Sequence, residues 1–450
     1  MKLPRIRTRP DFALMTTPIR TAIVGAGHRA LIYADHALQH PDEMQITAVA
    51  DPDADRRRRT AETFNLPPEA CFASADELAA ATPRVADVAI NGTMDHQHVA
   101  TSLPLLRAGY HLLLEKPFAT DKDGLQQLAS AAREHDRKVV ICHVLRHAPF
   151  YSEIRRRVAA GTIGRLFNLQ LAEHVSFHHT VVSYVRGKHR SKESCHASML
   201  LAKCCHDIDL IVWMNGGTSP SSVSSFGSRS FFREEMAPAG AGTVCLLDCP
   251  AEVEKACLYS TRKHYLEHPD RWQFYVWASL EGVENPSLAQ KERLLRDPEN
   301  PFARCVFRHS NDVVDRQSVA IEFANGSTAT LNMVGGAATG SRSIHLVGDR
   351  GEIFGKLEDG CFTVRTIEAS PDRDFSDEIV NVGEAGDDTT GVSGGHGGGE
   401  AHLMSDFVRV VRGEPPSLST TSLEDSIYGH LLCFAADRSM EERRIVSIND

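Results

Sequence analysis

Two residues, Lys116 and His206, have the chemistry to move a proton. Lys116 precedes Pro117, which biases the backbone away from helix and fixes the loop that carries the amine. An amine held in this way could hydrogen-bond a substrate hydroxyl and help to deprotonate it, although a surface lysine is the alternative. His206 has Lys203 three residues before it and Asp209 three residues after it on an expected helix, so the three side chains can share a face. Histidine is the usual general base near neutral pH, although a hydrogen-bonded core histidine gives the same pattern.

A glycine-rich turn predicts a dinucleotide site. Gly25-Ala26-Gly27-His28-Arg29-Ala30 has the form G-x-G-x-x-A and lies directly between an apolar segment and a helix-like one. The first glycine permits a tight turn, the second lets the backbone approach a pyrophosphate, and the small Ala30 allows close helix packing. An ordinary glycine turn is the alternative.

Asp51 ends the next expected strand, about 20 residues further on, where an acid can accept hydrogen bonds from an adenosine ribose. Its carboxylate would repel a 2′-phosphate, so the pattern predicts NAD in preference to NADP. The arginines from Arg56 to Arg59 would favour NADP if they bound that phosphate, but a solvated helix face explains them better.

These residues need a scaffold, and the first third of the chain alternates strand-like and helix-like segments. Such alternation predicts a parallel sheet covered by helices on both faces, that is, a doubly wound Rossmann domain over residues 18–148 after a loose tail at 1–17. The expected strands are Ile19 to Gly27, Ile46 to Asp51, Val85 to Gly92, His111 to Pro117 and Lys138 to His143, and Lys122 to His135 is an expected helix.

The pattern changes after residue 150. A helix-like stretch from Phe150 to Ala160 is followed by long alternating segments with glycine turns, which predict antiparallel strands. We therefore expect residues 149–450 to form an α+β domain with one large open, mainly antiparallel sheet. Glu281 to Pro301 and Gly383 to Gly399 are expected loops.

Three further motifs resemble one enzyme family. Glu115-Lys116-Pro117 at the end of a Rossmann strand resembles the signature of the glucose-fructose oxidoreductase and inositol dehydrogenase family (Gfo/Idh/MocA). Thr93-Met94-Asp95 with His98 is similar to the family's loop after the third Rossmann segment, and the segment from Lys203 to Asp209 is similar to its second-domain active-site helix. The resemblance is clear from Ile19 to Asp209 and looser beyond.

The resemblance implies an NAD(P)-dependent oxidoreductase of sugars or cyclitols. It implies that Thr93, Asp95, His98 and Glu115 lie beside the cofactor, and that members associate as dimers or tetramers through the open sheet. One position departs from the pattern: many relatives carry an aspartate four residues before the histidine, where this chain has Ala202.

Three more residues are candidates for substrate binding. Arg186 and Arg190, four apart around Gly187, could donate to a carboxylate or to several hydroxyls, although solvated surface arginines would look identical. His396 lies in the glycine-rich stretch before an expected helix, either in a loop that covers the substrate or in a flexible linker.

The cysteines suggest a metal site. Cys245, Cys249 and Cys257 have the spacing C-x3-C-x7-C, and with Cys305 they would supply four thiolates for a tetrahedral structural zinc ion. Separate core cysteines are the alternative.

Composition limits the class of protein. The chain has 450 residues, 42% of them hydrophobic, a formal charge of -10 and 11 cysteines. This size favours two domains, the charge argues against nucleic acid or an anionic membrane as partner, and no run of about 18 apolar residues occurs. The basic first residues lack the features of a secretory signal, so we expect a cytoplasmic protein with reduced thiols.

Three functions remain open from the sequence. The first is a dehydrogenase or reductase of a sugar, cyclitol or sugar acid. The second is a glycoside-cleaving enzyme that oxidises its sugar transiently with bound NAD, and the third is a non-catalytic NAD-binding sensor. Release of sugar without net NADH would identify the second, and binding without turnover the third.

Overall fold

The N-terminal part is a parallel sheet with helices on both faces. The computed structural model describes residues 17–268, 275–281, 283, 285–383 and 398–448. The six strands run in the order β3-β2-β1-β4-β5-β6, and every pair is parallel. The apolar strand sequences are buried on both sides, as a doubly wound sheet requires. The strands are β1 (Ile19–Val24), β2 (Met44–Ala50), β3 (Cys71–Phe72), β4 (Val88–Asn91), β5 (His111–Leu114) and β6 (Val139–Ile141).

Helices follow these strands in the expected alternation. Asp53, Ser74 and Asp121 each cap one of the helices by accepting backbone N–H groups of its first turn. The sequence did not predict β3 or α4. The helices are α1 (His28–Ala34), α2 (His36–Gln39), α3 (Ala54–Phe64), α4 (Ala75–Ala80), α5 (His98–Arg107) and α6 (Lys122–Glu134).

The C-terminal part carries an open sheet of nine strands in the order β14-β13-β12-β11-β7-β10-β9-β8-β15. It is antiparallel except for the pair β7 and β10. Alternate residues are buried, so one face is apolar and the other exposed. The strands are β7 (Leu166–Ser176), β8 (Pro220–Ser228), β9 (Arg316–Phe323), β10 (Thr328–Ala337), β11 (Ser341–Gly348), β12 (Gly351–Lys356), β13 (Cys361–Ser370), β14 (Arg373–Asn381) and β15 (Val446–Ser447).

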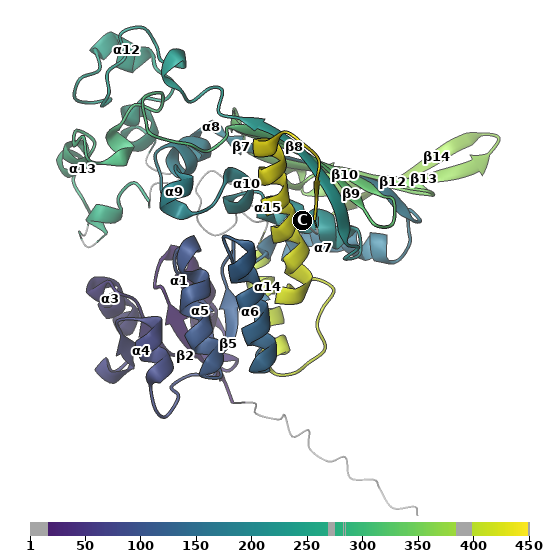
Figure 1. Cartoon of the computed structure of the whole chain (residues 1–450), viewed down its shortest axis with the longest axis horizontal. Helices are drawn as coiled ribbons and strands as arrows, with labels where there is room; N and C mark the ends of the chain where they lie inside the picture. The colour runs from purple at the N-terminus through teal and green to yellow at the C-terminus, as the bar shows by residue number, and fades with distance from the viewer. Residues whose placement is uncertain (1–16, 269–274, 282, 284, 384–397, 449–450) are drawn as a thin grey trace, which may run out of the picture.

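Helices α7 (Pro149–Ala159), α11 (Cys205–Met214) and α15 (Leu423–Glu442) cover the apolar face of this sheet. Helix α15 also joins the two cores, because Leu423 packs into the N-terminal core and Leu432 into the C-terminal one (Figure 1). Helix α14 (Gly399–Val411) packs Leu403 and Phe407 into the N-terminal core, so the boundary expected near residue 148 is crossed by later helices.

A long insertion separates β8 from β9. It holds α12 (Ala251–Ala256) and α13 (Leu288–Leu294), which Figure 1 shows away from the large sheet. The loop expected from Glu281 to Pro301 is therefore wrong in part, because Ser287 and Gln290 form a capping box that starts α13. The other expected loop falls mostly on residues 384–397, which include His396 and lie outside the described residues.

Three short helices connect β7 to α11: α8 (Phe177–His179), α9 (Lys192–Cys195) and α10 (Met199–Ala202). None of the helices in the described part of the chain has the length and hydrophobicity that crossing a bilayer requires.

Candidate active site

The glycine turn has the shape that a pyrophosphate site needs. Gly25 has φ +75°, and a Cβ there would lie 2.8 Å from the backbone of Thr93, so only glycine fits. No atom lies within 4 Å of the point where a Cβ on Gly27 would stand, which leaves open space beside the backbone. A Cβ on Gly92 would lie 2.8 Å from that of Ala30, so small residues let α1 pack tightly.

Asp51 holds this turn in place. Its Oδ2 accepts the N–H of Ala26 at 2.7 Å and its Oδ1 accepts the N–H of Asp53 at 2.8 Å. A carboxylate has about four acceptor sites, so hydrogen bonds to a ribose remain available to it. The geometry therefore fits a dinucleotide whose adenosine end lies beside Asp51.

His98 fixes two loops at the edge of the sheet. Its Nδ1 lies 2.7 Å from the carbonyl oxygen of Pro117, and its Nε2 lies 3.1 Å from that of Thr93. Burial lowers the pKa of the imidazole. The structure thus gives His98 a positioning role between the loop of Thr93 and the loop of Lys116.

Glu115 points inward and positions the same loop. Its Oε1 accepts from the Tyr33 hydroxyl at 2.7 Å and from Arg29 Nε at 3.1 Å, and its Oε2 accepts the N–H of Lys116 at 2.9 Å. Burial opposes its ionisation, but Arg29 and Lys116 outweigh burial and hold its pKa below the ordinary value. The Arg29 side chain is therefore directed into this buried ion pair.

Lys116 lies at the junction of the two parts of the chain. Its Nζ donates a hydrogen bond of 2.9 Å to the carbonyl oxygen of Ala202 at the end of α10. At Ala202 the chain thus offers Lys116 a backbone oxygen. His206 follows in the first turn of α11, buried, with its ring 5.6 Å from that of His143.

The shared face expected for Lys203, His206 and Asp209 does not form. The helix is interrupted between α10 and α11, and the two charged side chains have different partners. Lys203 Nζ lies 3.2 Å from Glu173 of β7, in a buried group that also contains Asp207 and Arg342. Burial raises the pKa of Asp207 to about 6. This group ties α11 to the large sheet.

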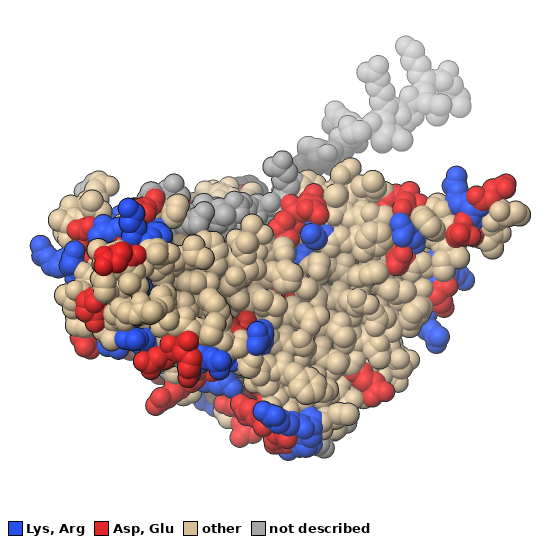
Figure 2. All heavy atoms as spheres, turned by 90° about the horizontal axis from the view of Figure 1, so that it is seen from above, with Lys and Arg blue, Asp and Glu red and all other residues tan. Residues whose placement is uncertain are grey.

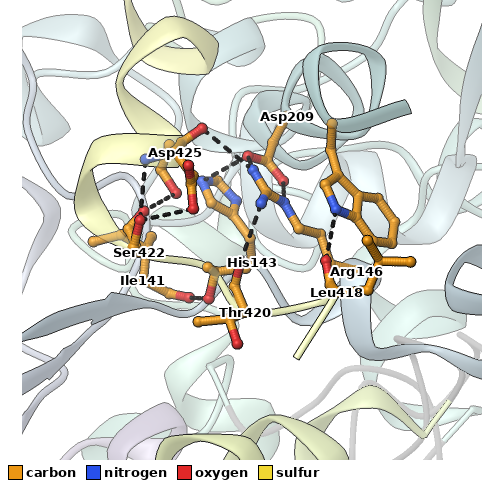
Figure 3. A network of polar contacts seen from close by, with 11 residues as sticks. Ile141, His143, Arg146, Asp209, Leu418, Thr420, Ser422 and Asp425 are labelled. Atoms are coloured by element: carbon orange, nitrogen blue, oxygen red, sulfur yellow. Dashed lines mark hydrogen bonds and ion pairs between the residues drawn. The ribbon is translucent and has the colours of Figure 1, made fainter. Parts of the chain in front are cut away.

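Asp209 pairs with Arg146, and its Oδ1 also lies 3.8 Å from Nε2 of His143. Arg146 Nε and Nη2 lie 2.7 and 2.5 Å from the two carboxylate oxygens, and both side chains are buried (Figure 3). The guanidinium also lies over the ring of Trp213, whose Nε1 donates to the carbonyl of Leu418. This bidentate pair joins the N-terminal part to α11.

Arg186 is fully buried and engaged within the insertion. Its Nε donates to the carbonyl oxygen of Arg304 at 2.7 Å, and its Nη2 donates to that of Tyr259 at 3.1 Å and lies 3.4 Å from Cys245 Sγ. Arg190 Nη1 donates to the carbonyl of Gly187 at 3.3 Å. The structure does not bring the two arginines together on one ligand.

The residues between these arginines reach the nucleotide domain. Lys188 Nζ lies 3.9 Å and His189 Nδ1 lies 3.5 Å from the carboxylate of Asp95. Burial lowers the pKa of His189 to about 3. Burial would raise the pKa of Asp95, but nearby positive charges, among them Lys188 and Lys116, hold it below its ordinary value. We call Asp95, Lys116, Lys188 and His189 the junction cluster. Sequence reasoning missed Lys188 and His189, and their place between two singled-out arginines was the only signal.

The four cysteines do come together. Cys245, Cys249, Cys257 and Cys305 line one cavity of about 20 Å³ in the insertion, and all four are free thiols. Among the described residues, no group of three or more His, Cys, Asp or Glu side chains surrounds a common metal position.

Comparison with known proteins identifies the class. Residues 19–143 match the model described as an oxidoreductase family with an NAD-binding Rossmann fold, and residues 155–448 match the model of its C-terminal alpha/beta domain. The chain is an NAD(P)-dependent oxidoreductase. It belongs to the Gfo/Idh/MocA family, as the motifs predicted.

Individual relatives are distant. YteT of Bacillus subtilis, named as an oxidoreductase, is 23% identical over 71% of this chain and 72% of its own length. Inositol 2-dehydrogenase of Corynebacterium glutamicum is 26% identical over 45% of this chain, and the match spans 56% of that enzyme. A solved structure of levoglucosan dehydrogenase with NADH and levoglucosan has a TM-score of 0.68 at 15% identity, covering 96% of this chain and 100% of that one, which shows a shared fold.

Proposed function

We propose that this oxidoreductase transfers a hydride between NAD and a hydroxyl-bearing carbon of a sugar, cyclitol or sugar-derived substrate. The observation that carries the proposal is the hydrogen bond from Lys116 Nζ to the Ala202 carbonyl, because it holds an ammonium at the sheet edge beside the helix of His206. The names of the inositol and levoglucosan dehydrogenases support a polyhydroxylated substrate.

The chain's residues divide the work at the reacting hydroxyl. An alcohol must lose its proton as the carbonyl forms, so a base has to lie within hydrogen-bond reach of that oxygen. We assign proton removal to His206 and stabilisation of the developing oxygen charge to Lys116. The bound nicotinamide supplies the hydride acceptor. We assign contacts with the other hydroxyls to Lys188 and His189, which lie beside Asp95.

NAD is the cofactor that the adenosine end favours. Asp51 presents a carboxylate where a 2′-phosphate would stand. Three of the four nearby arginines pair with acids: Arg58 pairs with Glu62, and Arg56 and Arg59 both pair with Glu281. Arg57 Nη1 donates to the carbonyl oxygen of Asp51. Their charge is therefore less available to a phosphate.

We expect substitution of Lys116 by Met to lower kcat about a hundredfold or more while NAD affinity stays nearly unchanged, because the lost ammonium acts on the reacting oxygen. His206→Ala should have a similar effect. The assay follows NADH and free sugar together across a panel that includes myo-inositol and levoglucosan, with calorimetry for NAD. Lys122→Met on the exposed start of α6 is the matched control.

Near-normal turnover of both variants would contradict this mechanism. Release of sugar without net NADH would identify the glycoside-cleaving alternative, and NAD binding without turnover of any compound would favour a sensor.

We also propose that copies of the chain associate through the exposed face of the large sheet. Phe226 is 72%, Phe167 46% and Val334 40% exposed there. Figure 2 shows a broad area with few charged side chains over the part of the molecule where Figure 1 places this sheet. Such a patch favours association. A monomeric mass in solution by light scattering would contradict the proposal.

A further inference from the structure

The insertion between β8 and β9 brings four separate cysteines to one point. Cys245 and Cys249 lie on one turn, Cys257 follows α12, and Cys305 comes almost fifty residues later. Their shared cavity of about 20 Å³ has room for a single ion or water, and an iron–sulfur cluster would not fit.

The backbone brings two of the cysteines to the same β-bridge. The N–H of Cys245 donates to the carbonyl of Ala303 at 3.0 Å, and the N–H of Cys305 donates to that of Thr243 at 2.9 Å. This reciprocal pair forms an antiparallel bridge between Val244 and Arg304, so Cys245 and Cys305 lie diagonally across it. Asp248 then accepts the N–H groups of Thr243 and Val244 and fixes the turn that leads to Cys249.

A buried cation lies beside the sulfurs. Nη2 of Arg186 lies 3.4 Å from Cys245 Sγ. A positive charge at this distance stabilises a thiolate, which is the form that binds a metal.

The insertion also has little else to hold it together. Its two named α-helices have six and seven residues and contain no buried side chain. Its apolar residues form two small clusters, around Phe232 and around Tyr265, that are separate from the core of the large sheet. Small units of this kind are commonly stabilised by a metal ion or a disulfide.

We infer that Cys245, Cys249, Cys257 and Cys305 bind one structural Zn²⁺ in tetrahedral geometry. In the structure, the four cysteine side chains do not surround a common metal position. Each thiol turns about a single bond, χ1, and binding of the ion requires the four side chains to rotate towards one position. In place of four buried thiols, the site would contain metal–thiolate bonds, which would hold the segments of the insertion together.

The test is the zinc content of the purified full-length protein. We expect about one zinc per chain, and release of that zinc as a mercurial reagent titrates about four thiols. Cobalt substitution should give the charge-transfer absorption of a tetrahedral thiolate site. The wild-type measurements keep the test valid if variants fold poorly.

Variants locate the ion. Cys257→Ser and Cys305→Ser should each hold less than about half an equivalent of zinc, whereas Cys361→Ser on β13, the matched control, should retain it. Zinc below about half an equivalent in wild type supplied with zinc, or disulfides among these cysteines in fresh protein, would overturn the inference. NAD binding is measured in parallel, so a failure here is distinct from a failure of the proposed function.

Discussion

The two sides of the junction hold their polar groups differently. At the edge of the parallel sheet the loops support one another: Asp51 holds the glycine turn, and His98 lies between the loops of Thr93 and Pro117. On the second-domain side, charged side chains form ion pairs with residues that lie far away in the sequence. Asp209 pairs with Arg146, and Lys203 pairs with Glu173.

The difference indicates which charged groups remain available to bind a substrate. A buried charge needs a partner, so a helix that packs on all sides distributes its polar side chains among its neighbours. In α11 that distribution uses Asp207 and Asp209 for packing. The polar side chains that remain at the junction are those of Lys188 and His189, which lie beside Asp95. Each prediction below tests whether a residue belongs to the packing or to the chemistry.

The largest effect should come from Asp209→Ala. It leaves Arg146 buried without its bidentate partner, which costs about 3–5 kcal/mol in the free energy of unfolding. Denaturant unfolding measures the loss, and Asp377→Ala is the matched control because Asp377 forms a similar bidentate pair with Arg365 at the surface. If the Asp209→Ala protein is stable and only its KM for the substrate rises, Asp209 belongs to the substrate site instead.

A smaller effect is expected for Asp51→Asn. The neutral amide can still accept one of the two backbone N–H groups, so the turn survives while the hydrogen bonds to the ribose weaken. We expect NAD affinity to fall about tenfold and the preference over NADP to narrow. Calorimetry with both cofactors measures this, and Asp53→Asn at the cap of α3 is the control. Wild type that binds NADP at least as well as NAD would contradict the charge argument.

Lys188 and Arg190 make the sharpest comparison, because they lie two residues apart. Lys188 faces Asp95 and the junction cluster, whereas Arg190 donates to its own loop. We expect Lys188→Met to raise the substrate KM about tenfold and Arg190→Met to change it less than about twofold. A larger increase in KM for Arg190→Met than for Lys188→Met would instead favour substrate binding by Arg186 and Arg190, which their spacing in the sequence suggested.

The same contrast explains what the sequence could predict. The glycine turn, Asp51 and the loop of Lys116 follow from local rules about strand ends and consecutive residues, and the structure forms each of them. The direction of the Arg186 side chain depends on the insertion, whose contacting residues lie about 60 to 120 positions away. No local pattern contains that information, so the sequence could not show that Arg186 is directed into the insertion.

Strand β3 and helix α13 were missed for a simpler reason. Strand β3 has two residues, too few to show alternation, and α13 has a mixed, mostly polar sequence without a buried face. The spacing of Cys245, Cys249 and Cys257, with Cys305 added to them, suggested a common site, and in the structure all four line one small cavity. Whether they bind zinc stays a prediction.

The smallest effect concerns the charge of His189. Burial lowers its pKa from 6.5 to about 3, Asp95 opposes that shift, and Lys188 and Lys116 reinforce it. The ring should therefore stay neutral from pH 5 to pH 8, and its NMR shifts, assigned with His189→Gln, should not change over this range. Because the folded pKa lies below the unfolded one, the folded protein binds fewer protons between pH 6.5 and 3. The contribution of His189 to stability is then fully present above pH 6.5 and is lost as the pH falls towards 3, so His189→Gln should flatten the decline of Tm on acidification. A His189 titration with a midpoint between pH 5 and 8 would show that the junction is open to water, and would move His189 from a neutral hydrogen-bonding group to a candidate proton carrier.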